Sequence, residues 1–133
     1  MFNFLSCPYG NVFKGSVPEN LFLRNAKLEN TSGMFSASNV NGELPDKLFS
    51  RNPNITTVSS MFRGCSNLTK INSTLFTSYN SSIKSFSSTF DGCTKLTGTA
   101  PSIWITNPSA TGTYCFTGCT KLSNYSDIPS TWK

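Results

Sequence analysis

The sequence predicts an α/β fold in which short repeated units stack into a solenoid, and three observations support this prediction. Phenylalanine recurs at Phe35, Phe62, Phe90 and Phe116, at intervals of 27, 28 and 26 residues. The pattern Phe-x-Gly-Cys occurs three times within the 133 residues. Ser, Thr and Asn exceed a third of the chain while 13% of it is aromatic, so polar loops would surround an aromatic core. A chain of this length suits one domain.

A second marker keeps the same period. The pairs Leu21-Phe22, Leu48-Phe49 and Leu75-Phe76 lie 27 residues apart, and Ile103-Trp104 follows after 28 more. A proline precedes most of these pairs, as in GSVPENLF and GELPDKLF. Because independent markers share one period, we expect a tandem repeat. The single domain at 1–133 then divides into a degenerate first unit at 1–25 and successive units at 26–53, 54–81, 82–109 and 110–133.

Each unit is expected to hold a short helical segment, a short strand and a further helical turn. In ITTVSSMFRGC the apolar residues Ile55, Val58, Met61, Phe62 and Cys65 recur with helical spacing. The glycine that follows suits a left-handed C-cap, and the Thr-rich segment NLTKIN suits a strand. The proline after the strand suits the start of the next helical turn. Since Ser and Thr are poor helix formers, these segments need neighbouring units for stability.

The repeated aromatic and cysteine positions make up the predicted core. Phenylalanines of the two markers would form two stacked rows, with Trp104 ending the second row. Equivalent cysteines on packed helices would lie too far apart for disulfides, so we expect free, buried thiols. A disulfide of Cys7, to the solenoid or to another chain, remains an alternative. The predicted core residues are Phe22, Phe35, Phe49, Phe62, Phe76, Phe90, Trp104, Phe116, Cys65, Cys93 and Cys119.

Residue types that catalysis or metal binding would need are absent or isolated. The sequence has no histidine, which excludes a Ser-His-Asp triad and leaves the cysteines without their usual base. Cys115 and Cys119 lie four residues apart, but zinc would need two further ligands. Glu19 and Asp46 directly follow a proline, where acids favour a helix N-terminus. We therefore predict a non-enzymatic protein without catalytic residues, metal or cofactor.

The charged residues predict at most a weak preference for anionic partners. The formal net charge is +5, yet the basic residues form no run of the kind that binds nucleic acid. No apolar stretch is long enough for a membrane span, and the first residues lack the features of a signal peptide. Lys95 and Lys121 are equivalent and Lys70 is close to them in register, so stacking would align them as a stripe. Such a stripe could face an anionic glycan or protein, and a solvated surface is the alternative.

The C-terminal end is the second candidate contact surface. The last unit stays in register up to Trp132, and no polar segment follows that would cover Phe116, Leu122 and Ile128. We therefore expect this end to be covered by another copy, another protein or a missing part of the chain. The candidate contact residues are Lys70, Lys95, Lys121 and Trp132.

The stretch VSSMFRGCSNLTKI and the Leu-Phe pair after it resemble the leucine-rich repeats of BspA-like surface proteins. The resemblance is to the subtype with about 26 residues per repeat and a Met-Phe-x-Gly-Cys motif. The second unit departs from it with Ser38 in place of cysteine. The resemblance implies a right-handed α/β solenoid with a strand ladder along one face. The matching positions are Val58, Met61, Phe62, Gly64, Cys65, Leu68, Ile71 and Phe76.

The resemblance also gives an expectation for function. BspA-like repeats occur in cell-surface adhesins, and the family is not one of enzymes. We expect a binding or adhesion module displayed at the cell surface or outside the cell, where it recognises a protein or a glycan. The alternative is a structural component of a phage virion, in its tail, fibre or capsid decoration, because similar repeats occur there. Fold alone does not decide between them.

Overall fold

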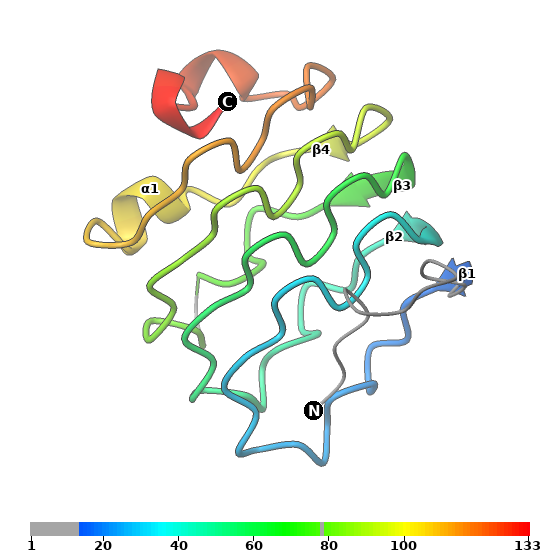
Figure 1. Cartoon of the computed structure of the whole chain (residues 1–133), viewed down its shortest axis with the longest axis vertical. Coiled ribbons are helices and arrows are strands. Elements are labelled where there is room, and N and C mark those ends of the chain that lie inside the picture. Colours follow the sequence, from blue (N-terminus) through cyan, green and yellow to red (C-terminus); the bar gives the residue numbers. More distant parts are fainter. Residues whose placement is uncertain (1–13, 78) are drawn as a thin grey trace.

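The computed structural model describes residues 14–77 and 79–133 (Figure 1). Within these residues, four strands form a parallel sheet in sequence order, and few residues are helical. The α/β class with short strands is therefore confirmed. The elements are β1 (Lys14–Ser16), β2 (Asn39–Glu43), β3 (Asn67–Ile71), β4 (Thr97–Gly98), the helix α1 (Ile103–Thr106), and two 3-10 turns, η1 (Tyr125–Asp127) and η2 (Ser130–Trp132).

Each strand pairs with the strand of the next unit. Lys14 is the register partner of Asn39 in the first strand pair, and Lys70 is the partner of Thr97 in the last. Parallel neighbours need a long connection, and here the chain crosses to the far side of the molecule and returns between strands (Figure 1). Equivalent connections of successive units consequently lie one above another.

The segment around each repeated phenylalanine is not helical, which corrects the sequence prediction. Residues 59–64 form turns in which alternate N–H groups bond to the next unit. The N–H groups of Val58, Ser60, Phe62 and Gly64 donate to that unit, while those of Met61, Arg63 and Cys65 donate to carbonyls three residues back in their own unit. The backbone N–H of Phe62 donates to the carbonyl of Thr89 at 3.0 Å, and that of Phe90 donates to Cys115 at 2.8 Å. Isolated parallel bridges join Thr57 to the units on either side of it. The helical spacing of apolar residues thus reflects a tight bend that buries the same positions.

Left-handed residues on both sides of each repeated phenylalanine explain why no helix forms. Gly64, two residues after Phe62, has a φ of 72°, as a left-handed C-cap would, but Ser60, two residues before, also has a positive φ of 56°. Two such residues break the helical path. A Cβ on Gly64 would lie 3.6 Å from the Cα of Ala37, so the stacked bends are also close together. The positive-φ positions of the four bends are Gly33, Ala37, Ser60, Gly64, Ser88, Gly92, Tyr114 and Gly118.

Two rows of stacked aromatic rings run through the core. Phe62 is fully buried between Phe35 and Phe90, with ring centroids 5.5 and 5.6 Å away. Phe116 continues this row 5.7 Å beyond Phe90. Offset stacking at this separation is favourable beyond the area that it buries. The second row consists of Phe22, Phe49 and Phe76, at centroid distances of 5.4 and 5.2 Å.

Trp104 does not extend the second row, contrary to the sequence prediction. Phe76 instead meets the edge of Phe86, whose ring centroid lies 5.5 Å away. Trp104 is half-buried and contacts Phe116 and Trp132 edge-on. The reason is that Phe86 replaces a smaller residue of the earlier units, Val58 or Thr31, and its ring occupies the space at the end of the row.

The apolar end formed by the last unit is covered by the chain itself, which corrects the expectation of an open contact surface. Trp132 is only 8% exposed, and Phe116 and Ile128 are buried. The carbonyl of Trp132 accepts the N–H of Phe116 at 2.7 Å, a bond that a following unit would otherwise supply. Gly112 makes room for this, because a Cβ there would overlap the indole ring. Trp132 is therefore a core residue and not an exposed contact residue.

A buried ladder of asparagine side chains links the units on the side of the Leu-Phe pairs. The Nδ2 atom of Asn80 donates to the carbonyls of Phe49 and Asn52 at 3.2 and 3.1 Å. Asn52 makes the same pair of bonds to the unit before it, to the carbonyls of Phe22 and Asn25. Asn107 also donates to the carbonyl of the preceding asparagine, Asn80, but its second bond goes to the carbonyl of Ile83. Because a buried amide without partners is costly, this repeated geometry fixes how far each unit is displaced from the last.

Replacing Asn80 with alanine should lower the free energy of unfolding by about 1–3 kcal/mol, because two buried carbonyls lose a donor. Asn25 occupies the equivalent position in the first unit but is exposed, so Asn25→Ala should cost less than about 0.5 kcal/mol. Urea denaturation followed by circular dichroism measures both. Equal losses for the two variants would show that the ladder is not a stabilising element.

Candidate binding face

The outer side of the parallel sheet is the surface on which the repeats align polar side chains. Strand β2 buries Val40 and exposes Asn39 and Asn41, as alternation along a strand requires. Beyond β4, the N–H of Ser123 donates to the carbonyl of Gly98 at 2.9 Å and continues the ladder by one unit. We call this surface the sheet face. It consists of Lys14, Asn39, Asn41, Glu43, Asn67, Thr69, Lys70, Lys95, Thr97, Lys121 and Ser123.

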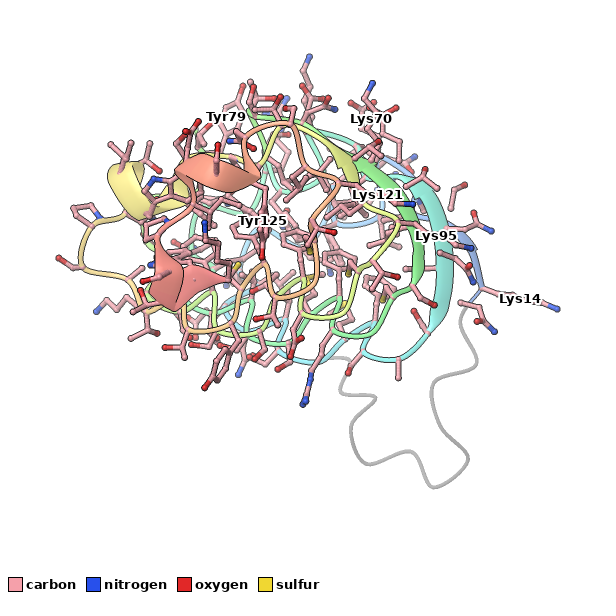
Figure 2. All side chains as sticks on the ribbon, turned by 90° about the horizontal axis from the view of Figure 1, so that it is seen from above. Lys14, Lys70, Tyr79, Lys95, Lys121 and Tyr125 are labelled. Atoms are coloured by element: carbon pink, nitrogen blue, oxygen red, sulfur yellow. The ribbon has the colours of Figure 1, made fainter. Side chains whose placement is uncertain are left out.

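Lysines give the sheet face its charge. Figure 2 shows Lys14, Lys95 and Lys121 on the side of the molecule where the strands lie, with Lys70 at a corner of that side. Both Lys95 and Lys121 directly precede a buried leucine, so each points outward as its neighbour points inward. The Nζ atom of Lys95 donates to Oδ1 of Asn67 at 3.4 Å, across one unit. Lys95 and Lys121 thus project from successive units at equivalent positions.

Among the described residues, Lys70 is the one lysine of the face with an acidic partner. Nζ of Lys70 lies 3.8 Å from Oε1 of Glu43, and both side chains are about half exposed. An exposed pair of this kind contributes little stability. Asn72 also donates to that carboxylate oxygen, at 2.9 Å. Among the residues that the structure describes, no carboxylate pairs with the other three lysines. Their charges are therefore available to a ligand.

Hydroxyl and amide groups fill the space between the lysines. The hydroxyl of Thr97 donates to the carbonyl of Thr69 at 2.7 Å, which leaves its lone pairs to solvent. The five large apolar residues that the described structure exposes lie elsewhere on the surface, and they are Leu21, Leu23, Tyr79, Ile105 and Tyr114. The sheet face is thus an open, polar and basic surface without an apolar anchor.

The repeated cysteines are structural. The thiol of Cys93 donates to the carbonyl of Phe62 at 3.1 Å, and Cys65 and Cys119 make the same bond to the unit before each of them. In the second unit Ser38 takes this position, and its hydroxyl lies 3.6 Å from Sγ of Cys65. Within the described part of the chain, no three residues of the metal-binding types are grouped to hold an ion. Cys7 lies outside the described residues.

Burial keeps these thiols protonated. It is the largest cause of the raised pKa of Cys65, Cys93 and Cys115, and it raises the pKa of Cys119 to about 12. The thiolate is the nucleophilic and metal-binding form of cysteine. None of the four described cysteines is therefore suited to covalent catalysis near neutral pH.

Comparing equivalent positions of the repeats in the sequence identified part of the sheet face and missed the rest. It identified Lys70, Lys95 and Lys121, but Lys14 belongs to the degenerate first unit, where the markers are lost. Asn39, Asn41 and the buried asparagine ladder were also missed. Two patterns in the sequence could have identified these residues. Asn39 and Asn41 flank a strand residue that is buried, and an asparagine follows each Leu-Phe pair, or its Ile-Trp equivalent, after three or four residues.

The comparisons with known proteins identify no relative. No family model matches the chain, and neither a curated protein nor a solved structure matches it. In the part of the chain that the structure describes, no helix combines the length and apolar character that crossing a membrane requires.

The buried thiols should resist alkylation in the folded protein. In a Cys7→Ser background at pH 8, iodoacetamide should modify Cys65, Cys93, Cys115 and Cys119 only after denaturation, because each is buried and has a raised pKa. Peptide mapping by mass spectrometry measures the labelling of each residue. Labelling of Cys93 in the native protein at the rate of a free thiol would contradict its burial.

Proposed function

We propose that the chain is a right-handed α/β solenoid of leucine-rich-repeat type, built of the five units defined by sequence. The parallel pairing of each strand with the strand of the next unit supports this proposal. So do the two aromatic rows, which repeat with the same period. Stacked units of this kind create extended surfaces on which equivalent positions line up.

The chain acts as a non-enzymatic binding or adhesion module that recognises a protein or a glycan through the sheet face. The observation that carries this proposal is the alignment of exposed lysine, asparagine and threonine side chains along the sheet. A reactive centre usually contains titratable groups whose pKa is shifted and which are open to a substrate. In the part of the chain that the structure describes, the shifted pKa values belong to buried cysteines, and the thiols of Cys65, Cys93 and Cys119 donate to backbone carbonyls.

The location that fits this role is the surface of a cell or the medium outside it. A phage virion is the alternative, in which the same face would hold the module to a neighbouring particle protein. Immunolabelling of intact cells and mass spectrometry of purified particles from the native source separate the two.

The binding role is tested with the isolated chain against panels of glycans and of extracellular matrix proteins, by biolayer interferometry. At least one ligand should bind saturably. The double variant Asn41→Tyr and Thr97→Tyr should weaken that binding at least about 10-fold, because bulky rings would block the sheet face. The matched variant Thr56→Tyr and Thr113→Tyr, at exposed positions on another side, should leave it unchanged. The absence of any saturable ligand, or an equal loss in both variants, would refute the proposal.

A further inference from the structure

We infer that the ligand of the sheet face is a linear anionic polysaccharide, which carries sulfate or carboxylate groups along its length. This inference rests on the proposed binding function and specifies its ligand. Charged residues are unevenly distributed between the sheet face and the rest of the chain. The sheet face holds four of the eleven basic residues but only one of the six acidic ones. The remainder of the chain has seven basic and five acidic residues, which is close to balance.

Lys95 and Lys121 lie along a line that crosses the strands, and Lys95 reaches Asn67 of the unit before it. Adjacent strands are about 5 Å apart, so Lys95 and Lys121, in successive units, are neighbours. Lys14 lies at the other end of the sheet, on β1 (Figure 2). It is offset from this line by two residues, because Ser16 and not Lys14 pairs with Asn41, the partner of Asn67. A ligand that meets all three must therefore be extended and must carry negative charge at several points. The compact anion of a single small molecule would reach only one end of this line.

Groups between the lysines suit a sugar chain. Asn39 and Asn41 present exposed amides, and Thr69 and Thr97 present exposed hydroxyls. These groups both donate and accept hydrogen bonds, as sugar hydroxyls and ring oxygens do. Its side chains are mostly exposed, and the hollow lined by Phe22, residues 24–29 and Met34 involves none of them, nor does the hollow lined by residues 81–84 and 106–110. A chain could lie across it without an end having to enter a pocket.

The residue types that the face lacks argue against other partners. Protein interfaces depend on aromatic or arginine anchors, and the sheet face has neither. Single-stranded nucleic acids stack their bases on aromatic rings, and duplexes are read mainly by arginine and paired amides in the grooves. The arginines of the chain, Arg24, Arg51 and Arg63, lie outside the face. Lysine, as a compact point charge with three donors, is sufficient for sulfate and carboxylate groups.

The test measures binding of the isolated chain to heparin and to polygalacturonate, with dextran as the neutral polysaccharide and oligo(dT) as the nucleic acid. Both acidic polysaccharides should bind, and their affinity should fall as salt rises from about 50 mM to about 200 mM, because exposed charges are screened. Dextran should not bind, and oligo(dT) should bind more weakly than either.

Matched lysine variants locate the site. Lys14→Ser, Lys95→Ser and Lys121→Ser together should weaken heparin binding at least about 10-fold, from the loss of three exposed ion pairs. The control replaces Lys27, Lys47 and Lys84 with serine, which removes the same charge from exposed positions elsewhere, and should change affinity less than about 3-fold. Circular dichroism confirms that both variants are folded.

Three results would overturn the inference: equal losses in the two lysine variants, tighter binding of oligo(dT), or no binding of either acidic polysaccharide. If the face instead binds a protein or a neutral glycan from the earlier panels, the proposed function stands and only this ligand assignment fails.

Discussion

Each unit of the chain leaves many backbone groups unpaired within itself, and the neighbouring unit supplies their partners. The bends around Phe62 and Phe90 donate N–H groups forward to the next unit, and each strand pairs with the strand of the next unit on the sheet side. Buried backbone groups without partners would be strongly destabilising. This requirement explains why the polar side chains buried between units also bridge them. The thiol of Cys93 and the amide of Asn80 both reach back to carbonyls of the preceding unit.

The same constraint generates the sheet face. Because every unit must pair with its neighbour in a fixed register, an exposed position in one unit lies next to the equivalent position in the next. Lys95 and Lys121 are aligned for this reason, and Lys95 reaches Asn67 one unit away. The inward residues fix the stacking, while the outward residues are free to vary in type. The proposed binding function therefore depends on the outward residues of the strands, while the repeated motif forms the core.

The sequence allowed the α/β class with short strands and most of the two aromatic rows to be predicted, because the markers recur at one interval. It did not reveal that the bends are non-helical. Ser60 and Ser88 adopt positive φ angles that serine rarely prefers, and only the stacked backbone imposes them. The predicted position of Trp104 in the second aromatic row was wrong because Phe86, a single larger residue, changes the packing of one unit. The covering of the last unit by Trp132 depends on Gly112, far away in sequence, whose missing side chain makes the space.

The central claim is that the units are equivalent layers, so that one can be removed whole. Deletion of residues 54–81 joins Pro53 to Ser82, which occupies the position of Asn54, and brings the next layer into register. Urea unfolding of this variant should remain a single cooperative transition, with a smaller m-value because less surface is buried. Deletion of residues 54–67, half of the same unit, should abolish the transition. A cooperative transition in the half-unit variant, or its loss in the whole-unit variant, would contradict the account.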